Sequence, residues 1–421
     1  MIHLIADQFH RCFGVLFFLL YAYQFFYLIV PLLFRRKAAP PPAAPRRIAV
    51  LIAARNEAAV IGQLLDSINA QTYPADKRAV FVVADNCTDD TAAVAAAHGA
   101  VVFERHNTRQ VGKGYALDYL LHAMAAAGET DFDAYLVLDA DNLLSPAYLE
   151  QMNRTLAQGY PIVTGYRASK NYGDNWISAG YGLWFLRESQ QLNRPRHRLG
   201  TGCFVSGTGF AFTAEILRRQ GGGWPYHLLT EDLEFTAAHL AAGDSIGYCE
   251  GAILYDEQPT RFSQSWRQRM RWAKGFLQVL RQEGGRLMAG IRRGSFACYD
   301  VLASMFPALA LTLAELLVSG AEIAALLIAG ESPLPALLSL ARMAAGVGGT
   351  LYLLGGITLL TEWKRIPAPG WKKLLYYLLF PLFMLTYVPI AVAALFRPVE
   401  WKPVAHTRAM TLHELAAEKN R

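Results

Sequence analysis

Short apolar runs alternate with helical patterns through the first half of the chain. The runs that we expect to form buried strands are Ile48–Ala53, Ala79–Ala84, Ala100–Glu104, Tyr135–Leu138 and Ile162–Tyr166. Segments with helical spacing lie between or after them, at Glu57–Asn69, Asp89–His98, Gly114–Ala127 and Leu233–Ala242. Strands that alternate with helices in this way predict an α/β domain with a Rossmann-like, mostly parallel sheet.

Longer apolar stretches flank this pattern and are long enough to cross a bilayer. The first, Phe13–Phe34, is followed by Arg35-Arg36-Lys37, so the positive-inside rule places these charges in the cytoplasm and the amino terminus outside. We expect an uncleaved anchor rather than a signal peptide, because no small-residue cleavage site follows and the run exceeds a usual signal core. Three further stretches are Val301–Ala329, Leu337–Leu360 and Leu374–Phe396.

The side of the membrane on which the chain ends is left open by this pattern. Three full C-terminal crossings would put the tail outside, whereas the basic residues of the tail favour the cytoplasm. Pro381 and Pro389 interrupt the last stretch, and a broken, partly re-entrant segment would reconcile the two. Glu315 and Glu322 are expected to face the bundle interior or a polar path, with exposure near the interface as an alternative for Glu322.

Two segments connect the apolar stretches to the α/β domain. Ala38–Pro45 is rich in proline and alanine and predicts a stiff, extended linker. Ser263–Gln282 alternates tryptophan and other apolar residues with arginine and lysine, which is typical of a helix on the cytoplasmic membrane face. The expected order is anchor, linker, α/β domain, amphipathic interface helices, C-terminal transmembrane segments and polar tail, at residues 1–37, 38–46, 47–258, 259–298, 299–396 and 397–421.

Composition narrows the cellular setting. The chain has 421 residues, of which 53% are hydrophobic, and a net charge of +6. The positive residues lie largely beside apolar segments, which favours anionic lipid headgroups and an anionic nucleotide over nucleic acid as partners. Five scattered cysteines without close pairing argue against a disulfide framework and a zinc site, so we expect the α/β domain in a reducing cytoplasm.

Acidic residues end the predicted strands. Asp139 and Asp141 follow the strand Tyr135–Leu138, and Asp85 follows Ala79–Ala84. Because the carboxyl ends of parallel strands form the ligand-binding edge of an open sheet, we expect these carboxylates to meet there. Two carboxylates at this spacing suit Mg²⁺ or Mn²⁺ that carries substrate phosphates. An acidic, solvated turn is the simpler alternative for the Asp139-x-Asp141 pair taken alone.

Further polar motifs follow along the chain. Gly112-Lys113-Gly114 opens a helix, where free amides and an ammonium group suit a phosphate, although it lacks the spacing of a P-loop. The glycines of Ser206-Gly207-Thr208-Gly209 allow the backbone to approach a ligand, and a tight turn is the alternative. Thr230-Glu231-Asp232 begins a helix, where Thr230 is a natural cap and Asp232 is either a favoured first-turn acid or a general base.

The combined pattern is more specific than any of its parts. Asp85, Asp139-x-Asp141, Thr230-Glu231-Asp232 and Gln268-x-x-Arg271-Trp272 occur in the order of a D, D-x-D, T/G-E-D, Q-x-x-R-W signature. The chain therefore resembles the family-2 membrane glycosyltransferases, which include cellulose, chitin and hyaluronan synthases and the rhizobial chitooligosaccharide synthase. The motifs of this resemblance extend from about Arg47 to Trp272, and the membrane segments match by layout.

The resemblance implies a GT-A fold, a nucleotide-sugar donor and inversion at the anomeric carbon. It assigns the nucleotide and donor to one set of residues, with the metal on Asp141 and Asp139: Ala53, Arg55, Glu57, Asp85, Lys113, Asp139, Asp141 and Arg271. Asp232 is then the catalytic base, with Glu231 beside it. The acceptor is assigned to Thr208, Gly209, Gln268 and Trp272.

Two departures qualify the resemblance. Ala84 stands where many relatives have a second aspartate before Asp85, so part of the nucleotide contact differs. The segment from Trp401 to His406 resembles only loosely the W-G-T-R gating segment of some synthases. A nucleotide-covering role for these two residues is therefore one hypothesis, and a headgroup anchor is the favoured one for Trp401.

The resemblance leads to a specific functional hypothesis. We expect an inverting membrane enzyme, with its catalytic domain in the cytoplasm at the cell membrane, that extends a β-linked polysaccharide from a UDP-sugar with Mg²⁺ or Mn²⁺. The alternative enzyme adds one or a few sugars to a lipid-linked acceptor. The expected partners are the UDP-sugar, a glycan or glycolipid acceptor and membrane lipids, with no nucleic acid and a possible homo-oligomer. An inactive glycan- or nucleotide-sensing scaffold is a hypothesis of a different class.

Overall fold

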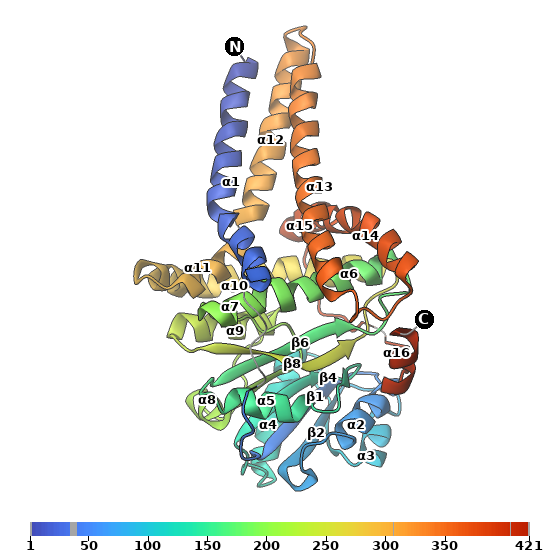
Figure 1. Cartoon of the computed structure of the whole chain (residues 1–421). Helices are drawn as coiled ribbons and strands as arrows, with labels where there is room; N and C mark the ends of the chain where they lie inside the picture. The colour runs from blue at the N-terminus through green and yellow to red at the C-terminus, as the bar shows by residue number, and fades with distance from the viewer. Residues whose placement is uncertain (1, 34–39, 306, 405, 420–421) are drawn as a thin grey trace.

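A computed structural model describes residues 2–33, 40–305, 307–404 and 406–419. Its centre is an eight-stranded sheet in the order β3-β2-β1-β4-β7-β6-β8-β5 (Figure 1). The strands are β1 (Ile48–Ala54), β2 (Arg78–Asp85), β3 (Val101–Arg105), β4 (Ala134–Asp139), β5 (Leu143–Leu144), β6 (Ile162–Ser169), β7 (Phe210–Thr213) and β8 (Ile246–Asp256). Every strand predicted from the apolar runs is present, and β5, β7 and β8 are additional.

The sheet is parallel in its first half and mixed in its second. The pairs β1–β2, β2–β3, β1–β4 and β6–β8 are parallel, whereas β7 runs antiparallel to both β4 and β6. The register aligns Ala53 of β1 with Asp139 at the end of β4. The predicted mostly parallel α/β sheet is therefore confirmed, and its carboxyl edge carries the acidic residues.

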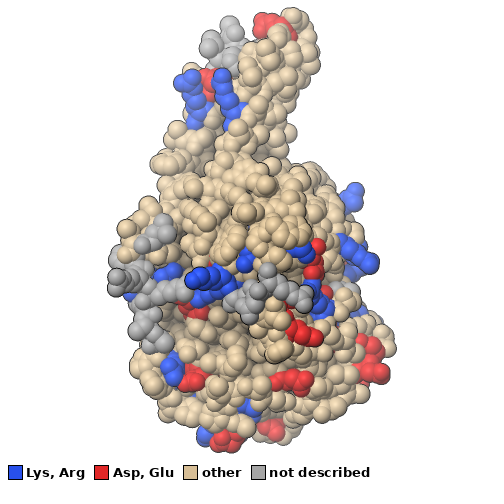
Figure 2. All heavy atoms as spheres, turned by 45° about the vertical axis from the view of Figure 1, so that its right-hand side comes forward, with Lys and Arg blue, Asp and Glu red and all other residues tan. Residues whose placement is uncertain are grey.

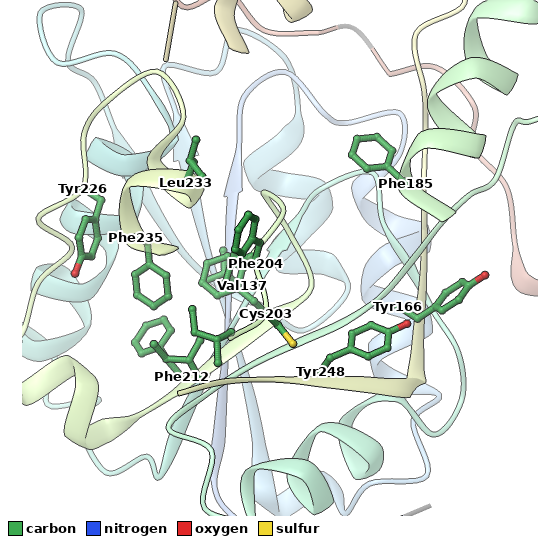
Figure 3. Close-up of a cluster of buried hydrophobic side chains, with 14 of the residues drawn as sticks. Val137, Tyr166, Phe185, Cys203, Phe204, Phe212, Tyr226, Leu233, Phe235 and Tyr248 are labelled. Carbon is green, nitrogen blue, oxygen red and sulfur yellow. The ribbon is translucent and has the colours of Figure 1, made fainter. Parts of the chain in front are cut away.

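Helices pack on both faces of the sheet because alternate residues of each strand point to opposite sides. The domain helices are α2 (Ile61–Asn69), α3 (Thr91–Ala97), α4 (Lys113–Ala126), α5 (Tyr148–Leu156), α6 (Trp176–Arg187), α7 (Arg194–Leu199), α8 (Ala214–Arg219) and α9 (Glu231–Ala242). One core contains Val50 and Leu136 with side chains of α2 and α5. The other contains Val137, with side chains of α4 and α9 such as Phe235, and is drawn in part in Figure 3.

Four helical regions are long and apolar enough to cross a membrane. They fall in α1 (Ile2–Leu33), α12 (Pro307–Ile328), α13 (Leu334–Glu362) and the pair α14 (Gly370–Leu385) and α15 (Tyr387–Phe396). Helices α1, α12 and α13 contact one another and stand together above the domain, whereas α14 and α15 lie across their base (Figure 1). On the face shown in Figure 2, an uncharged band separates the charged tip of this bundle from the charged domain.

The first two predicted membrane stretches differ from the structure in their bounds. Helix α1 starts well before Phe13, and the predicted Arg35–Lys37 flank and the start of the linker lie outside the described residues. The stretch predicted from Val301 is divided between α11 (Phe296–Met305), which lies across the base of the bundle, and α12 (Figure 1). The apolar pattern cannot register this division because both helices are apolar.

A break between α14 and α15 explains how the tail reaches the domain. Helix α10 (Phe262–Arg292) contains the predicted amphipathic segment and runs along the base of the bundle. Its Arg269 is buried and donates to the carbonyl oxygen of Phe383 at 3.0 Å and the hydroxyl of Thr386 at 2.9 Å. This cation stabilises the C-terminal end of α14. Arg269 therefore holds the break, whereas the sequence predicts only a basic helix on the membrane face.

The polar tail packs on the α/β domain. Its helix α16 (Leu412–Lys419) places Leu415, together with Met410, against Leu143. The tail and the domain thus lie on the same side of the bundle, as the predicted broken last segment requires. Glu315 and Glu322 of α12 face α1, where His10 lies 2.5 Å from Glu315 and 3.2 Å from Glu322. Both carboxylates therefore face the bundle interior.

Candidate active site

Asp139 ends β4 beside an ammonium group. Lys113 at the start of α4 forms an ion pair with the Asp139 carboxylate and donates to the carbonyl oxygen of Gly207 at 2.7 Å. The Asp139 side chain keeps about a third of its surface exposed, at 36%. The helix-opening lysine and the strand-end carboxylate therefore meet at the sheet edge, with a carboxylate oxygen accessible to a ligand.

Asp141 is more buried than Asp139 and is held by the end of β8. Its carboxylate accepts from the amide of Glu257 at 2.6 Å, and the ammonium of Lys170 donates to its carbonyl oxygen at 2.8 Å. Burial opposes ionisation, but the charges of His406 and Lys170 outweigh it and lower the pKa of Asp141. Asp141 is thus fixed as an anion at 4% exposure.

Thr208 and Gly209 lie behind the cavity wall. The Thr208 hydroxyl donates to the side-chain oxygen of Asn142 at 2.5 Å and accepts from the amide of Asp139 at 2.9 Å. A Cβ at Gly209 would meet Leu254 at 1.8 Å. These two residues therefore support the Asp139–Asn142 turn, while their neighbours Ser206 and Gly207 line the cavity. The predicted acceptor contact of Thr208 and Gly209 stays a prediction.

Asp85 ends β2, which is separated from β4 by β1, at the same edge of the sheet. It already has a cationic partner. Arg105 at the end of β3 donates to it at 2.6 Å, and both side chains are buried. Asn86 adopts a left-handed conformation with φ 53° and also donates to Asp85. The carboxylate still lines the cavity, and its contact with a nucleotide stays a prediction.

The C-terminal tail covers the end of the cavity formed by β1. The Nδ1 atom of His406 lies 2.9 Å and 3.0 Å from the two carboxylate oxygens of Glu57. The guanidinium carbon of Arg55 lies over Trp401, 5.5 Å from its ring centroid. Burial by itself lowers the pKa of His406, but the carboxylates of Asp141, Glu57 and Glu257 outweigh it and raise the pKa to about 10. The tail therefore brings a cation to the carboxylate cluster. Trp401 lines this cavity, which is a different environment from the headgroup anchor that the sequence favours.

The tail is also held by backbone contacts. The amides of Thr407 and Arg408 donate to the Glu257 carboxylate at 3.2 Å and 3.0 Å. The Arg408 side chain forms ion pairs with Asp174 and Glu418. These contacts hold the tail against Glu257, whose own amide donates to Asp141.

Asp232 and Glu231 begin α9 on the side of the cavity opposite the tail. Thr230 occupies the cap position, but its hydroxyl has no hydrogen-bond partner among the described residues, so the predicted side-chain cap is not formed. Burial and the neighbouring Asp232 raise the pKa of Glu231 to about 7, and burial raises the pKa of Asp232. A carboxylate with a raised pKa is a better proton acceptor, as a general base requires.

Helix α10 presents the Gln268-x-x-Arg271-Trp272 motif to the cavity. Trp272 packs edge-on against Tyr181 and Phe185, with ring centroids 5.7 Å and 6.2 Å apart. The side-chain oxygen of Gln268 is buried without a hydrogen-bond partner among the described residues. A buried acceptor of this kind is costly unless a ligand donates to it. Gln268 is therefore suited to a hydroxyl donor.

Several cavity residues were not predicted from the sequence. Arg167 of β6 pairs with Asp256 of β8, with 2.6 Å between Nε and a carboxylate oxygen, and its guanidinium lies 3.6 Å from the Phe185 ring centroid. Glu188 begins the π-helical turn η2 (Glu188–Asn193) and lines the same cavity. Burial raises the pKa of Glu188. A polar residue at the end of the predicted strand Ile162–Tyr166 was the available signal for Arg167, whereas Glu188 lies in a helix with no distinguishing pattern.

One continuous cavity of about 1130 Å³ contains these groups. Every site residue predicted from the sequence lines it, except Thr208 and Gly209. The cavity extends upward between α1, α12 and α13, where it is lined by side chains such as Phe17, Leu311 and Met343. A charged chamber at the sheet edge is therefore joined to a mostly apolar cleft in the membrane bundle, whose lining also includes His10, Glu315 and Arg342.

The protein side chains at this site could supply only some of the ligands of a divalent cation. The described residues contain no group of three or more histidine, cysteine or acidic side chains placed to hold a metal ion. Asp139 and Asp141 supply two carboxylates, and an oxygen of Asp256 in the same cavity is buried without a partner. Mg²⁺ and Mn²⁺ that carry substrate phosphates characteristically use one or two carboxylates and take the remaining ligands from phosphate and water. The donor set therefore suits a metal that arrives with a nucleotide diphosphate.

The sheet, its acidic edge and the flanking helices define a GT-A glycosyltransferase. The family model "Glycosyltransferase like family 2" matches residues 45–275, and the chain belongs to this family. Among solved structures, the mannosyltransferase PcManGT from Pyrobaculum calidifontis, in complex with GDP-Man and Mn²⁺, covers 94% of this chain and 99% of its own with a TM-score of 0.60. The sequence identity is 22%, so this similarity shows the shared fold.

Curated relatives of different functions each match about half of the chain. The probable glycosyltransferase YdaM of Bacillus subtilis is 28% identical over 240 residues, covering 54% of each chain. The β-monoglucosyldiacylglycerol synthase of Nostoc sp. is 28% identical over 247 residues, covering 55% of this chain and 49% of its own. Cellulose synthase 1 of Komagataeibacter xylinus is 27% identical over 240 residues, covering 54% of this chain and 14% of its own. The chain thus spans about half the length of the first two.

Proposed function

We propose that this glycosyltransferase transfers a sugar from a UDP-sugar to the hydroxyl of an amphiphilic lipid acceptor at the membrane surface, with inversion. The observation that supports this choice is the joined cavity, which runs from Asp139 and Asp141 into the apolar cleft between α1, α12 and α13. An acceptor with a polar head and an apolar chain matches both parts of that cavity. The proposed orientation places the domain and the tail in the cytoplasm.

The donor lies at the sheet edge in this proposal. Asp85 and the tail around His406 hold the nucleoside, and Lys113 and Arg271 neutralise charge on the departing diphosphate. A divalent cation on Asp141 and Asp139, when bound, supplies further charge neutralisation at the diphosphate. The cation of His406 contributes from the opposite side, since its pKa stays above neutral.

The acceptor hydroxyl approaches from the α10 side. Asp232 removes its proton as it attacks the anomeric carbon on the face opposite the diphosphate, which gives inversion. Gln268 orients the hydroxyl through its unpaired side-chain oxygen, and Trp272 offers a flat surface to the acceptor head. Phe185 and Tyr181 fix the plane of the Trp272 ring from its edges.

The test uses purified full-length protein in neutral detergent with Mn²⁺ and radiolabelled UDP-glucose, UDP-galactose or UDP-N-acetylglucosamine, with GDP-mannose as an alternative donor. Each donor is incubated with and without a total bacterial lipid extract. We expect UDP release that depends on the lipid extract and label in the organic phase as a product bearing one or a few sugars. Lipid-independent release, or turnover only with GDP-mannose, would contradict the proposal.

Extension of a β-linked polysaccharide is the second candidate. Trp272 beside the cavity offers the stacking surface that a growing glycan chain needs, and cellulose synthase is among the relatives. Among the described helices, however, the upper part of the cavity is lined by α1, α12 and α13, and a polymer channel needs more helices to enclose it. Label in a high-molecular-weight, glycanase-sensitive product of the same assay would favour this candidate over lipid glycosylation.

A further inference from the structure

Arg187 is a buried cation in the wall of the cavity. It ends α6 where that helix meets α1, and its residue is 5% exposed. Its guanidinium donates to the side-chain oxygen of Gln24 on α1 at 2.9 Å and lies 5.2 Å from the ring centroid of Trp184. Gln24, Trp184 and Arg187 all line the cavity, at the level where the charged chamber becomes the apolar cleft.

The neighbouring acids are already engaged by other groups. Both carboxylate oxygens of Asp300 accept from Arg196, each at 2.9 Å, and the hydroxyls of Tyr23 and Tyr27 donate to them at 2.9 Å and 3.0 Å. Glu188 bonds to Ser206 and faces Arg167. Among the described residues, no carboxylate forms an ion pair with Arg187.

The guanidinium of Arg187 therefore uses few of its hydrogen-bond donors. It has five N–H donors, its Nε is buried without a partner, and one hydrogen bond, to Gln24, is formed within the described chain. Burial, followed by the nearby Arg196, lowers the pKa of Arg187 to about 10, which still leaves it charged at neutral pH. The charges of Glu188 and Asp300 partly offset the burial, but neither carboxylate forms an ion pair with Arg187. A buried cation without an ion-pair partner is costly, so the environment favours an anion from outside the chain.

We propose that Arg187 binds the phosphate group of the amphiphilic acceptor, so that the substrate is a phosphate-bearing lipid rather than a neutral one. An arginine fork binds phosphate oxygens in pairs, and this one lies between the reaction chamber and the cleft that takes the apolar chain. The inference rests on the proposed lipid acceptor and adds the chemical class of its head group. In the proposed function the donor diphosphate is bound instead at the carboxylate edge, near Lys113 and Asp139.

The binding test keeps the nucleotide site filled. Full-length protein in neutral maltoside micelles is saturated with UDP and Mn²⁺ and titrated calorimetrically with decyl phosphate, with decanol and with inorganic phosphate. We expect decyl phosphate to bind at least tenfold more tightly than decanol or inorganic phosphate. Equal binding of decanol would overturn the phosphate site, and equal binding of inorganic phosphate would overturn the amphiphilic ligand.

Variants assign the effect to Arg187. Arg187→Gln is expected to weaken decyl phosphate binding at least tenfold, whereas Arg198→Gln, an exposed arginine on α7 outside the cavity lining, leaves it unchanged. Retained UDP binding shows that the variant folds, and if Arg187→Gln loses UDP binding, Arg187→Lys is used and is expected to weaken binding severalfold. Unchanged affinity in the folded variant would overturn the inference.

The outcome is separable from that of the proposed function. If the lipid extract is glycosylated but decyl phosphate binding does not depend on Arg187, the lipid acceptor stands and the phosphate contact fails. If no lipid is glycosylated and label appears in polymer, the proposed function itself fails. The binding assay needs no turnover, so the two results are independent.

Discussion

His406 lies 2.9 Å from the carboxylate of Glu57, although 349 residues separate them in the chain. The contact joins the C-terminal tail, which follows the last membrane helix, to the loop after the first strand of the sheet. It places a cation beside Asp141 and covers the end of the cavity formed by β1. The membrane region and the catalytic edge are therefore linked through this segment.

Removal of this cation is expected to weaken donor binding. His406→Ala should raise the dissociation constant for UDP and Mn²⁺ by roughly tenfold, or ~1.4 kcal/mol, because a charged hydrogen bond contributes on that order. Calorimetry with the full-length protein measures it. His413→Ala in the exposed part of α16 is the matched control and should bind like the unmodified protein. Unchanged UDP affinity in His406→Ala would show that the tail only packs on the domain.

Loss of the divalent metal ion, or of a carboxylate proposed to bind it, is expected to reduce sugar transfer strongly. Asp141→Asn should lower the rate of UDP release by about 10²-fold or more, since charge on the departing diphosphate is then poorly neutralised. Chelation with EDTA should have the same effect, with recovery on addition of Mn²⁺ or Mg²⁺. Asp131→Asn, at 89% side-chain exposure, is the control. Full activity after chelation would contradict a metal role for Asp139 and Asp141.

Asp232→Asn tests the base. Its transfer rate should fall by about 10²- to 10⁴-fold, the range for a lost general base, while UDP binding is retained. The comparison of single-turnover transfer with UDP affinity separates catalysis from binding. Parallel losses of both would indicate that Asp232 organises the donor site instead.

The pH dependence follows from the raised pKa values of this acidic pair. Burial and the neighbouring Asp232 raise the pKa of Glu231 to about 7, and burial raises the pKa of Asp232, so the pair retains a proton below neutral pH. A proton held by the pair makes Asp232 a poorer proton acceptor, so the transfer rate should increase as the pH rises through about 7. In Glu231→Gln the repulsion is absent, so the increase should move to lower pH. A profile that is flat from pH 6 to 8 would contradict this assignment.

Trp272→Ala should affect the acceptor more than the donor. The loss of a flat ring surface is expected to raise the KM for the lipid acceptor by about tenfold, which corresponds to the ~1–3 kcal/mol of a stacking contact. The KM for the UDP-sugar should stay the same. Trp272→Phe keeps an aromatic surface against Tyr181 and Phe185 and should retain most of the activity. An equal rise in both KM values would indicate a general disturbance of α10.

The sequence alone determined the α/β domain, the acidic strand ends and the membrane-length helices. Parallel buried strands are continuous apolar runs, and Asp139, Asp141 and Asp85 follow those runs directly, so local pattern and sheet topology together predict their meeting. Lys113 was recognisable because it begins a helix between two glycines, and Asp232 because it belongs to the Thr230-Glu231-Asp232 motif at the start of a helix. These are properties of neighbouring residues along the chain.

The tertiary structure decided what depends on contacts between distant segments. The break at Thr386, the return of the tail to Glu57 and the unpaired charge of Arg187 all arise where helices from different parts of the chain pack together. Hydrophobic periodicity reports how a segment meets water or lipid, and it is the same whether an arginine faces a headgroup, a carbonyl oxygen or a cavity. Only the three-dimensional arrangement shows which partner each charge has, and that Arg187 forms no ion pair within the described part of the chain.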